Sequence, residues 1–280
     1  MVGPLSGDPY PAPGPARADG VASLVREISR EPGRRIAIPG TLNFRDAGGY
    51  PVADGGVTGW RRLLRSDGLG RLGLGATDLL GRLGLRTVLD LRTSAEAQLA
   101  PSPVDDLAGN GALTMNIPLI GDDLGEMPGD LVAIYDYVVD RRGAAIAAAI
   151  RSLARPGALP GLVHCTAGKD RTGIVVAFTL AAVGVPDHFV AADYALSSLY
   201  LDPRHTPTIF RVQESTGLGD RLTAALLASP PELILHVLDR ARRQAGSVAD
   251  YLAVHGVTCP ELTALRSALV TGGEELDEGG

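Results

Sequence analysis

Residues 164–173 read HCTAGKDRTG, and two apolar stretches of different length flank them. Residues 162–164 form a short apolar run typical of a buried strand, whereas residues 172–183 are long and apolar enough for a buried helix that Gly184 would end. We therefore expect the segment between them to turn tightly from the end of a strand into the start of a helix. Gly168 supplies the backbone freedom that such a turn needs.

Cys165 and Arg171 stand six positions apart in this turn, directly after His164. The chain has 5 histidines, 2 cysteines and 25 arginines, the last being its 26 basic residues less one lysine. At those frequencies a His-Cys pair followed by an arginine at this spacing is expected by chance about 0.003 times in the whole sequence. The arrangement therefore indicates a functional site.

A strand-to-helix loop of this length aims successive backbone N–H groups inward and makes a nest for a tetrahedral anion. The same N–H groups and the helix dipole favour the thiolate of Cys165, which is the nucleophilic form. Arg171, in the first helical turn, can hold two phosphoryl oxygens with its planar fork. These features predict a two-step hydrolysis of phosphate monoesters, in which Cys165 attacks phosphorus and water then hydrolyses the phosphocysteine. This chemistry requires no metal or other cofactor.

The leaving group of such a reaction needs a proton, and Asp170, within the loop, is the nearest carboxyl group. Asp122 and Asp123, in a polar loop, are more distant candidates. Asp170 could instead cap the helix or pair with an arginine, so its role stays open at this point.

The residues between the nucleophile and Asp170 are candidates for binding the substrate. Thr166, Ala167 and Gly168 would contribute backbone N–H groups to the phosphoryl oxygens. Lys169 is the only lysine in a chain that otherwise uses arginine, and it would place a compact positive charge facing a doubly charged substrate. The alternative is that this lysine stands there by chance.

Two further residues of the motif suggest supporting roles. Thr172 could donate to the sulfur of Cys165 and ease its departure in the second step, and His164 could orient the loop from behind through its ring N–H groups. The plainer alternative is that His164 and Cys165 are only the buried end of a strand, since free cysteine is often buried.

Charged residues outside the loop are expected to support it rather than to react. Arg45, Asp46, Asp90 and Arg92 are predicted to form one ion-pair network beneath the loop, a structural role that we favour over direct catalysis. Cys259, near the C-terminus, is expected to be a packed bystander.

Composition excludes several classes of protein. The chain has 280 residues, of which 45% are hydrophobic and 21% charged, as in ordinary globular proteins. Its net charge of −6 provides no basic field for nucleic acid. The longest apolar stretch, residues 172–185, is about 14 residues and too short to cross a bilayer as a helix. With two cysteines and no visible signal peptide, we expect a cytoplasmic protein without stable membrane insertion, although non-classical secretion is compatible with these features.

Short β-branched runs alternate with longer helical patterns, which predicts an α/β fold with a central, mainly parallel sheet flanked by helices and a helical C-terminal half. We expect one catalytic domain over residues 21–270, between a Pro/Gly-rich tail (1–20) and an acidic tail (271–280), with a helical lid possible within 187–245. Strands are predicted at 35–39, 60–65, 87–91, 114–119 and 162–164. Helices are predicted at 77–83 (capped by Thr77), 130–154 (broken at Gly143), 172–183, 187–198, 218–228, 231–244, 248–255 and 260–269.

With these residues in view, the chain resembles the cysteine-dependent protein tyrosine phosphatase superfamily, and its HCxAGKDRTG loop is similar to the branch that includes a mycobacterial phosphatase. Other segments that resemble this branch, spread over roughly residues 36–269, are 43–50, 64–66, 87–92, 251–257 and 261–262. The resemblance implies a central parallel sheet, a helical lid, and metal-free dephosphorylation of phosphotyrosine, with phosphoserine, phosphothreonine or phosphoinositides accepted by some members.

The resemblance also assigns roles within the loop. It maps the nucleophile to Cys165, the phosphate-binding arginine to Arg171, the proposed general acid to Asp170, and a lysine shared with lipid-phosphate enzymes to Lys169. Residues 199–230 contain prolines and few methionines or aromatic residues, so they depart from the lid of that branch.

Other functions remain to be weighed. The same mechanism could act on a small-molecule phosphate such as a sugar or nucleotide, because only 4% of the residues are aromatic and a phosphotyrosine cleft commonly has an aromatic wall. A phosphate-recognition module without turnover, and sulfur transfer by a rhodanese-like loop, are weaker alternatives. The retained nucleophile, arginine and acid disfavour the first, and the Gly-Lys-Asp-Arg-Thr run disfavours the second.

Overall fold

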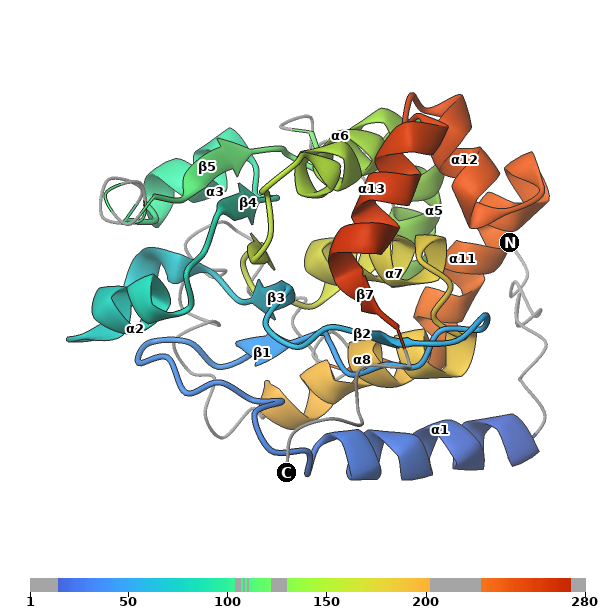
Figure 1. Ribbon diagram of the computed structural model, residues 1–280, viewed down its shortest axis with the longest axis horizontal. Helices are drawn as coiled ribbons and strands as arrows, with labels where there is room; N and C mark the ends of the chain where they lie inside the picture. Colours follow the sequence, from blue (N-terminus) through green and yellow to red (C-terminus); the bar gives the residue numbers. More distant parts are fainter. Residues whose placement is uncertain are drawn as a thin grey trace, which may run out of the picture.

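The computed structural model describes residues 15–103, 107, 109, 111–121, 130–201 and 228–272 (Figure 1). A five-stranded sheet lies at its centre, in the order β1-β3-β6-β4-β5. β1 is antiparallel to β3, and the other pairs are parallel, so the predicted mainly parallel sheet is confirmed. The strands are β1 (Arg45–Asp46), β3 (Leu63–Ser66), β6 (Gly161–His164), β4 (Thr87–Asp90) and β5 (Leu113–Asn116).

Both faces of the sheet are covered. Along the strands, Leu89 and Val163 belong to a larger hydrophobic core, whereas their neighbours Val88 and Leu162 belong to a smaller one, because successive strand residues point to opposite faces. The larger core is built with the helices α5 (Leu131–Arg141), α6 (Gly143–Ala154), α7 (Asp170–Ala182), α8 (Asp187–Tyr200), α11 (Pro231–Ala245), α12 (Val248–Val254) and α13 (Cys259–Leu269). The smaller core contains α2 (Ala76–Arg82).

The strand register brings the carboxyl ends of the parallel strands to one edge of the sheet. His164 pairs with Ser66 on one side and with Asp90 on the other, and Asp90 in turn pairs with Asn116. The loop that follows β6 therefore starts at the middle of this edge, where ligands commonly bind in open α/β sheets.

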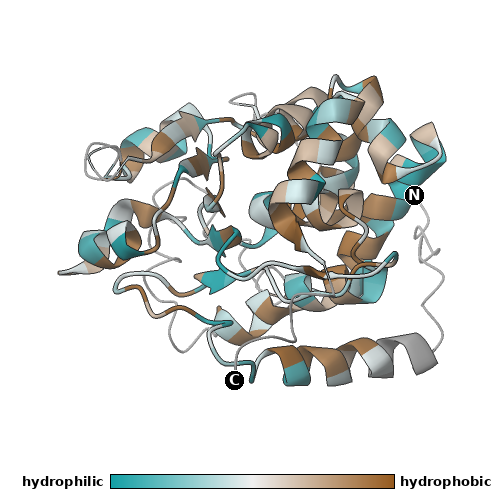
Figure 2. Ribbon diagram, in the orientation of Figure 1, coloured by the Kyte–Doolittle hydropathy of each residue, from teal (hydrophilic) through white to brown (hydrophobic). Residues whose placement is uncertain are grey.

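Helix α1 (Pro15–Ile28) lies alongside α8 at the edge of the molecule (Figure 1). It begins within the segment expected to be a tail, and Val21 and Ile28 are buried in the larger core. Its brown and teal banding in Figure 2 is that of a helix with one buried face. No helix was predicted here, because residues 1–20 were assigned to a Pro/Gly-rich tail.

Most of the predicted helices are present, including the break at Gly143, where α6 starts. A Cβ at Gly143 would lie 2.2 Å from the His255 ring, so the missing side chain gives room for His255, at the end of α12, beside the start of α6. Two predictions were wrong. Residues 35–39 form no strand, because only Arg35 makes an isolated bridge, to Arg45. Thr77 caps nothing, because α2 already begins at Ala76, after Gly75.

A small ribbon near the C-terminus also escaped prediction. β2 (Val57–Thr58) pairs antiparallel with β7 (Val270–Thr271), so Thr271 belongs to a strand although the acidic tail was expected to start there. Residues 218–227 of the predicted helix at 218–228, and the central part of the predicted lid, lie outside the described residues, and Ala228 itself is not helical. None of the described helices has the length and apolar character needed to cross a membrane.

Candidate active site

The loop after β6 packs closely against the end of β3. Gly168 has a φ of 67°, and a Cβ at this position would lie 2.3 Å from the backbone oxygen of Ser66. Cys165 at the start of the loop is 2% exposed, and α7 begins at Asp170. The predicted turn from strand end to helix start is therefore confirmed, and glycine is required at position 168 on two grounds.

The carbonyl groups of the loop are held from behind. Asn43 Nδ2 donates to the carbonyl oxygens of Ala167 and Gly168, each at 3.0 Å, and Arg65 Nη2 donates to that of Gly168 at 2.8 Å. In a trans peptide the N–H points opposite to the C=O. The N–H groups of Gly168 and Lys169 are therefore directed to the other side of the loop, as an anion nest requires.

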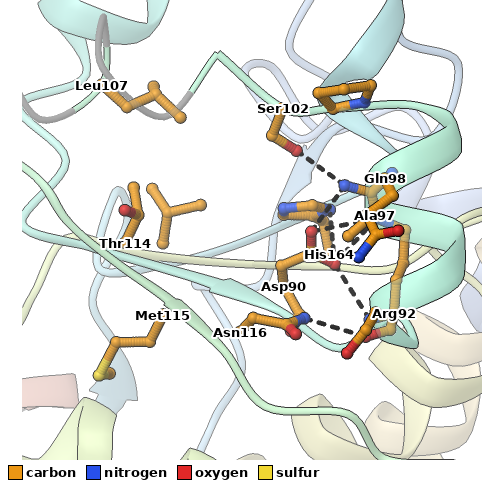
Figure 3. Close-up of a pocket in the computed structure, with 13 residues that line it drawn as sticks. Asp90, Arg92, Ala97, Gln98, Ser102, Leu107, Thr114, Met115, Asn116 and His164 are labelled. Carbon is orange, nitrogen blue, oxygen red and sulfur yellow. Dashed lines mark hydrogen bonds and ion pairs between the residues drawn. The ribbon is translucent and has the colours of Figure 1, made fainter. Parts of the chain in front are cut away.

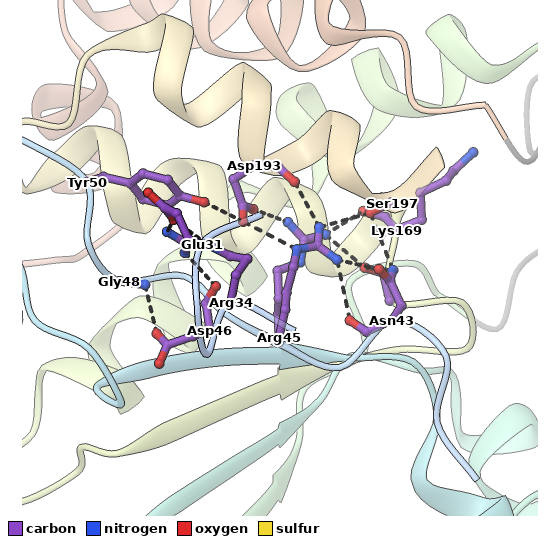
Figure 4. A network of polar contacts seen from close by, with 12 residues as sticks. Glu31, Arg34, Asn43, Arg45, Asp46, Gly48, Tyr50, Lys169, Asp193 and Ser197 are labelled. Carbon is purple, nitrogen blue, oxygen red and sulfur yellow. Dashed lines mark hydrogen bonds and ion pairs between the residues drawn. The ribbon is translucent and has the colours of Figure 1, made fainter. Parts of the chain in front are cut away.

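Asp193, on α8, organises the charged residues behind the loop (Figure 4). Its carboxylate lies 2.6 Å from Arg65 Nη1 and 3.3 Å from Arg45 Nε, and it accepts a hydrogen bond from the Tyr50 hydroxyl at 3.1 Å. All these side chains are buried. Burial favours the neutral acid, but the charges of Arg45 and Arg65 outweigh it and lower the pKa of Asp193.

The single network predicted for Arg45, Asp46, Asp90 and Arg92 does not exist. Asp46 instead accepts backbone N–H bonds from Gly48 at 2.8 Å and Arg61 at 2.7 Å. Asp90 and Arg92 form a separate pair with Nε–Oδ1 and Nη2–Oδ2 distances of 2.9 and 2.6 Å. The physical reason is the antiparallel register: Arg45 faces Arg65 across β1 and β3, and two buried cations need a shared anion, which α8 supplies.

Arg171 is held by Glu96, a residue that the sequence analysis did not single out. Arg171 Nη2 lies 2.7 Å from Glu96 Oε1, Nη1 contacts Oε2, and Nη2 also donates to Thr166 Oγ1 at 3.1 Å. Glu96 is on the short helix α3 (Ser94–Leu99), where its side chain also accepts from the backbone N–H of Thr93 at 2.9 Å in a capping box. The pattern Thr-x-x-Glu after β4 was the available signal.

The electrostatics of this contact are those of a tight ion pair. Burial by itself would raise the pKa of Glu96, but the hydrogen bonds and charge of Arg171, with a hydrogen bond from Thr166 at 2.5 Å, lower it to about 2. Glu96 therefore stays ionised over the whole range in which the protein is expected to work.

Among the residues that the structure describes, Asp170 neither caps a helix nor pairs with an arginine. Its Oδ1 accepts a hydrogen bond from the Tyr135 hydroxyl at 2.7 Å and lies 3.3 Å from Lys169 Nζ. The side chain of Asp170 is 34% exposed, so it combines fixed contacts on one oxygen with access to solvent. Lys169 is 1% exposed, and its ammonium also donates to the carbonyl of Ala228 at 2.9 Å, pointing away from the Arg45 cluster in Figure 4.

His164 and Thr172 do not make the contacts predicted for them. Among the described residues, the two ring nitrogens of His164 have no hydrogen-bond partner, and the Thr172 hydroxyl has none either. His164 is held by its backbone, whose carbonyl accepts from the N–H of Leu91 at 2.9 Å. Its ring lines a pocket of about 430 Å³ together with Asp90 and Asn116 (Figure 3). Burial lowers the pKa of His164 to about 4, so the ring is neutral at neutral pH.

Asp122 and Asp123 lie outside the described residues, so the structure does not place them relative to the loop. Cys259 is exposed at the start of α13, where it was expected to be packed. Within the described part of the chain, no three His, Cys, Asp or Glu side chains gather in a metal-binding arrangement.

Comparison with known proteins confirms the resemblance seen in the sequence. The sequence model of the tyrosine phosphatase family matches residues 36–271. The chain is 30% identical over 278 residues to the triple specificity protein phosphatase PtpB of Mycobacterium tuberculosis, covering 83% of this chain and 98% of that protein. It is 32% identical over 169 residues to a tyrosine-protein phosphatase of Nostoc commune, covering 56% of each. Among solved structures, the core catalytic domain of the PP-IP phosphatase SIW14 from S. cerevisiae aligns with a TM-score of 0.35 and 15% identity, covering 65% of this chain and 96% of that one.

Gly168→Ala tests the fit of the loop. The added methyl group combines a left-handed backbone with a clash against immovable backbone atoms, so we expect a loss of about 3 kcal/mol or more in the free energy of unfolding and loss of tungstate binding. Gly157→Ala is the matched control, because Gly157 has a φ of 72° but nothing within 4 Å of its Cβ position. Equal losses of unfolding free energy in the two variants, measured by urea denaturation, would show that the close contact with Ser66 does not matter for stability.

Glu96→Gln tests the Arg171 pair through its pH dependence. Because the folded-state pKa of Glu96 is about 2, against an ordinary value of 4.5, its contribution is fully present above pH 4.5 and is lost as pH falls through 2. We expect the variant to be less stable than the parent by roughly 3 kcal/mol at pH 7 and by roughly 1 kcal/mol at pH 3. Glu261→Gln is the control, since Glu261 fills the same capping-box position on α13 beside the exposed Arg151. A stability difference for Glu96→Gln that does not change with pH would refute the assignment.

Asp193→Asn leaves Arg45 and Arg65 buried without their shared anion. We expect this substitution to lower the free energy of unfolding by about 3–5 kcal/mol in denaturant melts. Asp187 lies on α8 as well, and Asp187→Asn breaks its partly exposed pair with Arg242 of α11. This substitution is expected to cost about 0.2–1 kcal/mol. Similar costs for the two variants would show that the buried cluster does not hold the loop in the way described.

Proposed function

Because this chain belongs to the tyrosine phosphatase family, we propose that it hydrolyses phosphate monoesters in two steps through a phosphocysteine on Cys165. The observation that carries the proposal is the loop itself. Asn43 and Arg65 donate hydrogen bonds to the carbonyl oxygens of Ala167 and Gly168. The N–H groups of the same peptides are directed to the opposite side, and Cys165 and Arg171 lie at the two ends of the loop.

In the first step the thiolate of Cys165 attacks phosphorus, a sulfur–phosphorus bond forms and the bond to the alcohol or phenol oxygen breaks. Asp170 gives its proton to that oxygen. In the second step the carboxylate of Asp170 takes a proton from water, whose oxygen attacks phosphorus. The sulfur–phosphorus bond then breaks, which releases inorganic phosphate and restores the thiolate.

Charges around the loop support a dianionic substrate. Arg45 and Arg65 share the buried carboxylate of Asp193, so these three side chains together carry a positive charge behind the nest. His164 is neutral, so its ring adds no positive charge beside Cys165. Thr166 contributes its hydroxyl to the Arg171–Glu96 contact, in addition to the backbone role predicted for it.

For the substrate class, we propose phosphotyrosine, phosphoserine or phosphothreonine proteins or phosphoinositides, supported by a relative named for triple specificity. The second candidate, a small sugar or nucleotide phosphate, is favoured by the aromatic content of 4%. A substrate panel separates them: a tenfold preference in kcat/KM for a soluble metabolite, about 1.4 kcal/mol in barrier, would favour the second.

Cys165→Ser tests the mechanism with an aryl phosphate in the presence of EDTA. We expect turnover to fall at least about a thousandfold, and rapid quenching of the parent enzyme to trap a phosphocysteine. Cys259→Ser is the matched control, because Cys259 is the other free cysteine and is exposed far along the chain on α13. Unchanged turnover in Cys165→Ser would end the proposal, and tight phosphopeptide binding without turnover in the parent would favour a recognition module.

A further inference from the structure

Asp170 is held by a residue that lies 35 positions earlier in the chain. Tyr135, on α5, donates its hydroxyl hydrogen to Asp170 Oδ1 at 2.7 Å, and its oxygen lies 2.8 Å from the hydroxyl of Tyr194 on α8. Tyr135 is fully buried and Tyr194 is 1% exposed. Three helices that are separate in the sequence therefore meet at one carboxyl group.

While Asp170 accepts a hydrogen bond from Tyr135, the hydrogen bonds in this chain of three groups run in one direction. Burial, with the nearby Asp170 carboxylate, raises the pKa of Tyr135 well above its ordinary value, so the hydroxyl stays protonated. Its single hydrogen goes to Asp170, which leaves Tyr194 as the donor to Tyr135. The order is Tyr194 to Tyr135 to Asp170.

This order gives the two carboxyl oxygens of Asp170 different roles. Oδ1 is fixed by Tyr135 and lies near Lys169 Nζ, whereas Oδ2 has no hydrogen-bond partner within the described part of the chain. Because the side chain is one-third exposed, Oδ2 is the oxygen that can carry and deliver a proton.

The packing of Tyr135 and Tyr194 in the core does not itself require their hydroxyl groups. Both rings lie in the larger apolar core, where phenylalanine would fill the same space. A Cβ at Gly173 would lie 2.7 Å from the Tyr194 ring, so the glycine in the loop motif lets α8 bring Tyr194 close to α7.

We propose that Tyr135, backed by Tyr194, is a positioning residue that fixes the orientation of Asp170 so that Oδ2 faces the leaving group. This inference rests on the proposed function, in which Asp170 is the general acid. Proton donation matters most for a poor leaving group and little for a very good one, so the effect of Tyr135 must depend on the substrate.

The test compares kcat/KM for phenyl phosphate and for 2,4-dinitrophenyl phosphate, because kcat/KM reports the step that breaks the bond to the leaving group. We expect Tyr135→Phe to lose about tenfold on phenyl phosphate and less than twofold on the dinitrophenyl ester. Asp170→Asn should show the same pattern with a larger loss, and adding Tyr135→Phe to Asp170→Asn should cause no further loss. Tyr251→Phe is the matched control, since Tyr251 is a buried tyrosine whose hydroxyl donates to the Val139 carbonyl at 2.6 Å, and it should affect both substrates equally.

Equal losses on the two esters for Tyr135→Phe, or full additivity with Asp170→Asn, would overturn the positioning role. If Asp170→Asn itself shows no dependence on the leaving group, the assignment of the acid in the proposed function fails, which is a separate result. If Tyr135→Phe does not fold, the test uses Tyr194→Phe instead. We expect Tyr194→Phe to lose two- to threefold in kcat/KM on phenyl phosphate and nothing on the dinitrophenyl ester. Equal losses on both esters would refute the proposal.

Discussion

The site depends on the anchoring of two backbone carbonyls, those of Ala167 and Gly168. Peptide planarity means that fixing a C=O on one side of the loop fixes an N–H on the other. Asn43 and Arg65 supply the donors that hold these carbonyls, and both residues come from the N-terminal part of the chain. A Gly168 without a Cβ lets the loop approach Ser66 closely enough for those contacts to form. The nest that binds an anion is thus stabilised from its outer side, before any substrate arrives.

The two arginines behind the loop repel each other, and a carboxylate on α8 offsets this repulsion. Arg45 and Arg65 are neighbours on adjacent strands and fully buried, so their repulsion must be offset within the protein. Asp193 does this for both, and the cluster keeps a net positive charge near the site of a dianion. Glu96 plays a comparable part for Arg171, because it holds the guanidinium beside Thr166 and remains ionised at any working pH.

The two charge clusters and the Tyr135–Tyr194 contact show a common organisation. Two side chains of the loop are held from other helices, Arg171 by Glu96 on α3 and Asp170 by Tyr135 on α5. Asp193 on α8 acts one step further away, because it pairs with Arg45 and Arg65 behind the loop. A short loop cannot fix its own side chains, because it has too few internal contacts, so the surrounding helices supply the rigidity that catalysis needs. The neutral His164, buried beside a pocket, belongs to this scaffold rather than to the reacting groups.

The parallel sheet, most of the helices and the loop could be predicted from the amino-acid sequence, because apolar periodicity and the spacing from Cys165 to Arg171 are local properties that can be read without knowledge of the fold. The sequence also indicated Asp170 as the carboxyl group nearest the nucleophile. The residues that contact the loop and its charged neighbours became visible only in the folded structure. Asp193, Glu96 and Tyr135 lie from 35 to 148 positions away from the charged residues that they contact, and nothing in their local sequence records the partner. Likewise, Arg45 and Asp46 are adjacent in the chain but face different neighbours, because alternate strand residues point to opposite sides.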